Sequence, residues 1–141
     1  MYMELNYIVI LGGAIVSMIV GSIWYGPLFG KKWMEITGAA DCTEEERKKM
    51  QKEAIPLYIT QFLLTLLQLF VLVNQMTWGG WTKQAMGVAF FYWLGFIMPT
   101  VAGSAMWNGN STRIKWMTFL IQTGYQLVMF LIFGLMIQTW G

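Results

Sequence analysis

The sequence lacks histidine, contains a single cysteine and has few charged residues. One cysteine cannot close an internal disulfide, and without histidine there is no Cys/His metal site. A nucleophilic triad also needs a general base beside the nucleophile, and histidine usually fills that role. The seven acidic residues all fall outside the long apolar runs, which disfavours a paired-carboxylate active site. We therefore expect no enzymatic activity, no metal site and no cofactor.

Charged residues make up 11% of the chain and hydrophobic residues 57%, whereas a soluble domain usually carries about 25% charged residues. Four runs contain no charge, and each is long enough to cross the hydrocarbon of a bilayer. They cover residues 5–29, 55–74, 85–106 and 117–139. The sequence thus predicts an all-α fold, an integral membrane four-helix transmembrane bundle formed as one domain over residues 1–141. Its partner is the lipid bilayer, and the net charge of +2 is too small to indicate nucleic acid.

Aromatic residues and lysines mark the ends of these runs, as expected at the two surfaces of a membrane. Seven of the eight tryptophans lie at or just beyond the end of a run, and only Trp93 lies within one. The predicted interfacial anchors are Trp24, Tyr25, Lys31, Lys32, Trp33, Trp78, Trp81, Trp107, Trp116 and Trp140.

Basic residues are unequally divided between the segments that join the runs. Eight of the nine lie in residues 31–54 and 107–116, and only Lys83 lies on the opposite side. The positive-inside rule then predicts a multi-pass protein of the cell membrane, with these two segments in the cytoplasm and both termini outside.

The polar segment 31–54 carries the signature of a helix start. Thr43 followed by Glu46 fits a capping box, and Glu44 with Lys48 forms an oriented i,i+4 pair. We expect a short solvated helix that leads into the second run, with Pro56 in the first turn of that run. A helix that docks a partner is the alternative interpretation.

Small residues recur on one face of the first run and of the third. In lipid, such faces let two helix backbones approach closely, either within one chain or between two copies. Pro99 also frees the carbonyl of Gly95, which predicts a kink that Thr100 or Ser104 hydroxyls help to satisfy. The predicted packing and kink residues are Gly13, Ser17 and Gly21 in the first run and Gly95, Pro99 and Gly103 in the third.

Neutral polar side chains are the remaining candidates for function, because no ionisable acid or base lies within the four runs. One interpretation is that they form hydrogen bonds between helices, worth about 0.6 kcal/mol each in a membrane. The other is that they line a shared polar cavity for a neutral solute or a lipid headgroup. The candidate cavity residues are Gln61, Thr65, Gln68, Tyr92, Gln122, Tyr125 and Gln126.

Three groups of residues also resemble a known family. They are WYGPLFGK at residues 24–31, WLGF at 93–96 followed by Pro99, and Gly124-Tyr125 with Leu127-Val128. In this order they are similar to the small membrane proteins named domain of unknown function 1761. The resemblance spans nearly the whole chain and implies a four-span bundle without an assigned activity or cofactor. Members often carry serine in place of Gly26 and histidine in place of Gln126, so this chain departs from the family there.

Two kinds of function follow from these observations. In the first, a homo-oligomer forms a binding or permeation unit for a neutral small molecule or lipid, since four helices leave little room for a pore in one copy. In the second, the protein is an accessory subunit that contacts other membrane subunits through its glycine faces and charged segment. The absence of a large region outside the membrane favours the first.

Overall fold

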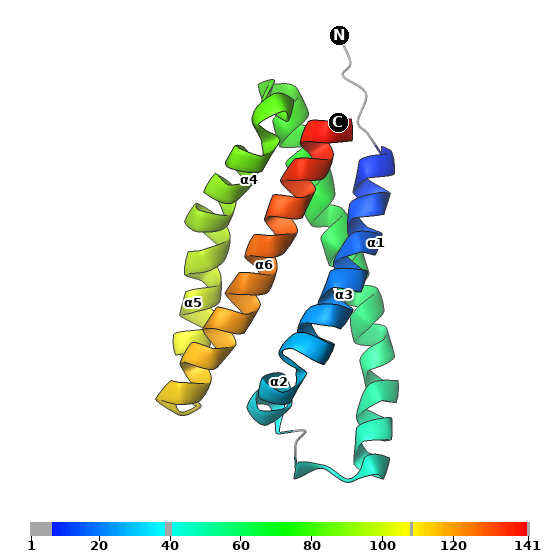
Figure 1. Ribbon diagram of the computed structural model, residues 1–141, viewed down its shortest axis with the longest axis vertical. Helices are drawn as coiled ribbons and strands as arrows, with labels where there is room; N and C mark the ends of the chain where they lie inside the picture. The colour runs from blue at the N-terminus through cyan, green and yellow to red at the C-terminus, as the bar shows by residue number, and fades with distance from the viewer. Residues whose placement is uncertain (1–6, 39–40, 108, 141) are drawn as a thin grey trace.

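The computed structural model describes residues 7–38, 41–107 and 109–140, and every regular element among them is helical (Figure 1). Four helical segments are long and apolar enough to cross a membrane: Tyr7–Leu28, Glu44–Gly79, Thr82–Met106 and Thr112–Trp140. The all-α bundle of four apolar helices predicted from the sequence is therefore confirmed. The first predicted residues of the first run, 5 and 6, lie outside the described part.

The first span consists of α1 (Tyr7–Ile23) and a π-helical turn, η1 (Trp24–Leu28), after which α2 (Gly30–Thr37) begins. The sequence predicts that the first span ends at residue 29, whereas the structure continues with helical backbone into α2. Proline has no N–H and its ring crowds the preceding turn, and a π-helical turn widens the backbone at that point. The helix therefore continues through Pro27, and Lys31 and Lys32 lie in a second short helix.

The second span is one helix of 36 residues, α3 (Glu44–Gly79). Its N-cap is the predicted one, because the Thr43 hydroxyl accepts a hydrogen bond from the Glu46 N–H at 3.2 Å. The structure differs from the sequence-based prediction in one respect. The short polar helix and the apolar span form one continuous helix, with Pro56 inside it. The carbonyl that Pro56 leaves free belongs to Lys52, in the polar part of the helix, where water can satisfy it.

The third span is assembled from α4 (Ala85–Tyr92), a second π-helical turn, η4 (Trp93–Ile97), and α5 (Met98–Met106). The short 3₁₀ turn η3 (Thr82–Gln84) leads into it. The π-helical turn η4 ends two residues before Pro99, at which the sequence predicts a kink. The Thr100 hydroxyl donates to the Phe96 carbonyl at 2.6 Å, one residue after the Gly95 carbonyl that Pro99 leaves free.

The fourth span, α6 (Thr112–Trp140), begins five residues earlier than the apolar run. The polar side chains that precede the run are therefore helical, and they connect α6 to the other polar segment. The Arg113 guanidinium forms an exposed ion pair with Glu35 of α2. Both polar segments consequently lie at the same end of the bundle, opposite the α3–α4 turn (Figure 1).

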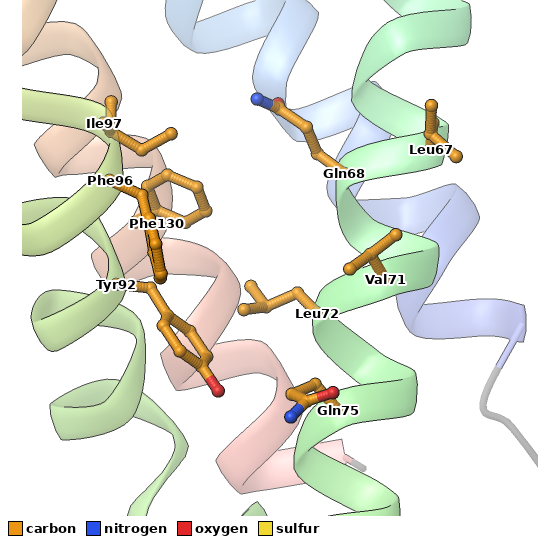
Figure 2. Close-up of a pocket in the computed structure, with 9 residues that line it drawn as sticks. All are labelled: Leu67, Gln68, Val71, Leu72, Gln75, Tyr92, Phe96, Ile97 and Phe130. Atoms are coloured by element: carbon orange, nitrogen blue, oxygen red, sulfur yellow. The ribbon is translucent and has the colours of Figure 1, made fainter. Parts of the chain in front are cut away.

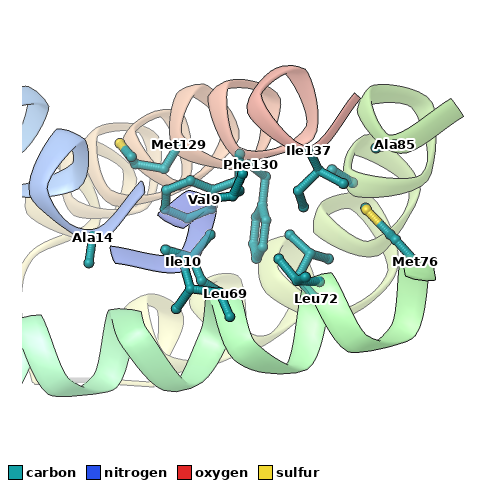
Figure 3. Close-up of a cluster of buried hydrophobic side chains, with 13 residues drawn as sticks. Val9, Ile10, Ala14, Leu69, Leu72, Met76, Ala85, Met129, Phe130 and Ile137 are labelled. Carbon is teal, nitrogen blue, oxygen red and sulfur yellow. The ribbon is translucent and has the colours of Figure 1, made fainter. Parts of the chain in front are cut away.

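The packing order of the helices is α3, α1, α6 and then α4–α5. α1 packs against both α3 and α6, while α6 also packs along α4 and α5. The buried core lies toward the end that carries the α3–α4 turn (Figure 3). Its members are Val9, Ile10, Ala14, Leu69, Leu72, Val73, Met76, Ala85, Ala89, Met129, Phe130, Phe133 and Ile137. Toward the polar end, α3 is more exposed and makes fewer of these contacts.

Among the described glycines, Gly134 of α6 has the least room for a Cβ, and it was not among the packing residues predicted from the sequence. A Cβ at Gly134 would lie 2.6 Å from the Met86 Cα and 2.9 Å from the Ala85 oxygen, so the backbones of α4 and α6 would have to separate.

We expect Gly134→Ala to lower the free energy of unfolding by about 1–3 kcal/mol. Titration with a denaturing detergent in mixed micelles measures this loss. Gly87→Ala is the matched control, because nothing lies within 4 Å of a Cβ there, and equal losses for both variants would contradict the prediction.

Cys42, the only cysteine in the sequence, lies just before α3 in a polar segment that we predict to be cytoplasmic. Its reaction with a thiol reagent therefore tests the predicted orientation. Desolvation raises the pKa of its thiol, as do a hydrogen bond with Glu46 and the charges of Glu46 and Asp41, while Arg47 lowers it. The thiol is therefore mostly protonated at neutral pH, and we expect its alkylation to become faster as the pH rises. An impermeant maleimide applied to intact cells should leave it unlabelled and should label it after the membrane is opened. Labelling from outside intact cells would reverse the predicted orientation.

Candidate functional site

A groove of about 520 Å³ runs between α3 and the third span, with one side chain of α6 at its base (Figure 2). Its side chains are Leu67, Gln68, Val71, Leu72 and Gln75 from α3, Tyr92, Phe96 and Ile97 from α4–η4, and Phe130 from α6. The exposed fractions of Leu67, Val71 and Phe96 are 59%, 56% and 67%, so one side of the groove is open. This volume lies within the range of small-molecule sites, about 300–1,000 Å³.

Helical spacing brings these residues together on both walls. On α3, Gln68, Leu72 and Gln75 recur every three or four residues and share a face, and Tyr92 and Phe96 do the same across the groove. The walls remain apart because α3 packs mainly on α1, whereas α4 and α5 pack on α6. They meet only nearer the α3–α4 turn, where Met76 and Ala85 belong to one buried cluster.

The groove is mostly apolar and contains three neutral hydrogen-bonding groups. They are the amides of Gln68 and Gln75 and the hydroxyl of Tyr92, and none of the three has a hydrogen-bond partner within the described part of the chain. In Figure 2 the Tyr92 hydroxyl points toward Gln75 across the groove. None of the described side chains that line the groove is charged. The arrangement suits a neutral molecule that is mostly apolar and carries few hydrogen-bonding groups.

The structure brings two of the seven predicted cavity residues, Gln68 and Tyr92, into this groove. Gln61 and Thr65 instead interact with each other. The side-chain amide of Gln61 donates to the Thr65 hydroxyl at 3.4 Å, and that hydroxyl donates to the main-chain carbonyl of Gln61 at 2.9 Å. Gln75, which also lines the groove, was not among the predicted cavity residues, because it lies one residue beyond the predicted run 55–74. The signal was available, because Gln75 lies seven residues after Gln68 on the same helical face.

The predicted polar residues of α6 lie outside the groove. The Tyr125 hydroxyl donates to the Ser17 carbonyl of α1 at 3.0 Å and thereby joins α6 to the first span. Gly21 lies beside it, since a Cβ there would be 3.3 Å from the same hydroxyl oxygen. Gln122 and Gln126 are half-buried on α6, and neither forms a hydrogen bond among the described residues.

Two tryptophans hold α6 from both sides at nearly the same level. The indole N–H of Trp24 donates to the Ile121 carbonyl at 3.0 Å, and that of Trp93 donates to the Thr123 carbonyl at 3.1 Å. Each tryptophan is the first residue of a π-helical turn, η1 or η4. Trp24, which the sequence analysis assigned to the membrane surface, thus contacts another helix. The Thr123 hydroxyl at this level is buried and has no partner among the described atoms.

The other predicted anchors lie toward the ends of the helices. Tyr25 packs edge-on against Trp33 of α2, with ring centroids 4.7 Å apart, and both are half-buried. The remaining side chains are exposed: Lys31, Lys32, Trp78, Trp81, Trp107, Trp116 and Trp140. This placement is compatible with their predicted positions at the two surfaces.

The two predicted small-residue faces differ in their surroundings. Gly13 faces α3, because a Cβ there would lie 2.8 Å from a methyl group of Leu69, and Ser17 is buried nearby. Gly95 and Gly103 have nothing within 4 Å of a Cβ, so they lie on an open outer face of the third span together with the exposed Pro99. Among the described residues, no group of three acidic, cysteine or histidine side chains could hold a metal ion.

The indole hydrogen bonds give a direct prediction. Trp24→Phe and Trp93→Phe keep an aromatic ring and remove the donor, so each should lower the free energy of unfolding by about 0.6–1.5 kcal/mol. Detergent-denaturation titrations measure the change. Trp78→Phe is the control, because Trp78 is exposed and forms no hydrogen bond among the described residues. A loss as large for Trp78→Phe as for the other two would show that these hydrogen bonds add nothing.

Comparison with known proteins gives one finding. Residues 8–138 match the model of the family described as protein of unknown function (DUF1761). No curated protein and no solved structure matches the chain. The match covers almost the entire sequence and includes all three groups of residues on which the resemblance was based. The chain therefore belongs to the DUF1761 family.

Proposed function

We propose that this protein is a non-catalytic membrane protein that binds a neutral, largely apolar molecule, a lipid or a small solute, in the groove between α3 and α4–η4. The observation that carries the proposal is the composition of the groove. Six apolar side chains form its walls, and three neutral polar groups without partners project into the same space.

The energetic cost of those unpartnered groups supports a ligand. An amide or hydroxyl transferred to hydrocarbon without a hydrogen bond loses several kcal/mol, and lipid tails offer no partner. Gln68, Gln75 and Tyr92 are therefore best satisfied by a molecule that carries its own donors or acceptors into the groove. A charged ligand is disfavoured, because no opposite charge lines the groove to compensate for its desolvation.

The open side of the groove also bears on assembly. A second copy placed against that side would close the groove into an enclosed site, which is how a homo-oligomer of four-helix chains could form a binding or permeation unit. The orientation predicted from the basic residues belongs to the same proposal, with both polar segments in the cytoplasm and both termini outside.

A second candidate function rests on a different surface. The outer face of the third span is open at Gly87, Gly95 and Gly103, and small residues let a neighbouring helix approach closely in lipid. This face favours the alternative in which the protein is an accessory subunit of a larger membrane complex.

Filling the groove tests the main proposal. Val71→Trp adds bulk at the open side, and Leu64→Trp is the matched control, since Leu64 lies two turns earlier on α3, is half-exposed and does not line the groove. The probe is a neutral alkyl diazirine alcohol, photolysed with the full chain in proteoliposomes and located by peptide mass spectrometry. We expect labelling concentrated on the groove residues in the wild type and reduced at least about fivefold in Val71→Trp only, a loss of about 1 kcal/mol of binding.

Uniform labelling over all lipid-facing surfaces of the wild type would contradict the binding proposal. A change of labelling in Leu64→Trp equal to that in Val71→Trp would do the same, because it would show a general effect of added bulk on α3.

A further inference from the structure

The groove has a defined depth relative to the ends of the helices. Gln75 lies four residues before the end of α3 at Gly79, where the exposed Trp78 and Trp81 mark the helix end. Gln68 lies eleven residues before Gly79, about 16 Å along the helix axis. Half of a bilayer's hydrocarbon is roughly 15 Å thick. The groove therefore extends from one surface of the membrane to about its middle, the depth of a single leaflet.

Polarity changes along this depth. Near the surface, the Gln75 amide and the Tyr92 hydroxyl face each other across the groove (Figure 2). Deeper in, the walls are mostly apolar, with Leu67, Phe96 and Ile97, and the Gln68 amide is the one polar group among the described lining residues at that depth (Figure 2). A molecule that matches this profile has a hydrogen-bond acceptor near the membrane surface and an apolar chain that points toward the bilayer centre.

The open side determines the route of entry. Leu67, Val71 and Phe96 are each more than half exposed, and on an apolar span of this kind that exposed surface faces lipid tails. A chain can therefore enter sideways from the bilayer. Among the described residues at this end of the bundle, Lys83 is the one charged side chain, so recognition of the polar part falls to neutral groups.

We infer that the occupant of the groove is one acyl chain of a membrane lipid from the leaflet on the side of the α3–α4 turn. Its ester or amide carbonyl accepts hydrogen bonds from the Gln75 amide and the Tyr92 hydroxyl, and its tail lies along the deeper walls. This inference rests on the proposed function, because it names the class of molecule that the same groove binds.

Two photoactivatable phosphatidylcholines test the depth. One carries a diazirine near the glycerol ester, and the other carries it near the end of the acyl chain. With the full wild-type chain in proteoliposomes, the shallow probe should label the surroundings of Gln75 and Tyr92. The deep probe should label Leu67 and Phe96. The reverse pattern would place the lipid in the opposite leaflet and overturn the inference.

Competition tests the carbonyl contact. Unlabelled ester-linked phosphatidylcholine should displace the deep probe about fivefold better than the ether-linked lipid with the same chains, as expected for one net hydrogen bond. Gln75→Leu and Tyr92→Phe should each reduce this preference, because each removes one of the two donors, and the double variant should abolish it. Gln61→Leu should preserve it, because Gln61 is exposed on α3 outside the groove. Equal competition by both lipids in the wild type would overturn the carbonyl contact and with it the inference.

The outcomes separate this inference from the proposed function. If the diazirine alcohol labels the groove and neither phospholipid probe does, the groove binds a small neutral solute, and the lipid inference fails while the proposed function stands. If none of the three probes labels the groove above the level of other lipid-facing residues, both fail.

Discussion

Inside a membrane, an apolar side chain gains little by exchanging lipid for another helix, so a bundle needs close backbone contacts and hydrogen bonds to hold together. α6 supplies both. Its backbone approaches α4 closely at Gly134, and its carbonyls at Ile121 and Thr123 accept the indole N–H groups of Trp24 and Trp93. These contacts fix the first and third spans on either side of α6, and the positions of the other elements follow from them.

The groove is a consequence of this arrangement. One wall, α3, packs on α1, and the other wall, the third span, packs on α6. The two walls therefore meet only near the α3–α4 turn. The hydrogen bond of Trp93 also fixes the start of η4, the π-helical turn that carries Phe96 and Ile97 into the groove. π-Helical turns are frequent at functional sites, and η4 is one whose side chains line a candidate binding site.

The polar end of the bundle has a different physical character. There α2, the first turns of α3 and the start of α6 carry most of the charges, and the ion pair between Glu35 and Arg113 is exposed. An exposed ion pair of this kind contributes little stability. The helices are therefore held together less strongly at the polar end than in the core near Met76 and Ala85. The candidate groove begins at the tightly packed end and is open along one side, so it lies away from the charged end of the bundle.

The sequence by itself determined the fold class, the four long apolar helices and the Thr43 cap, because charge, length and capping act locally along the chain. It did not determine which polar residues meet. Gln68 and Tyr92 share a groove while Tyr125 bonds to α1, and Trp24 contacts α6 although its position suits a surface anchor. Those outcomes depend on which helices are neighbours and how each is rotated about its axis. The tertiary structure alone decided them, because an apolar helix presents no strong preference for one partner over another until its backbone contacts are made.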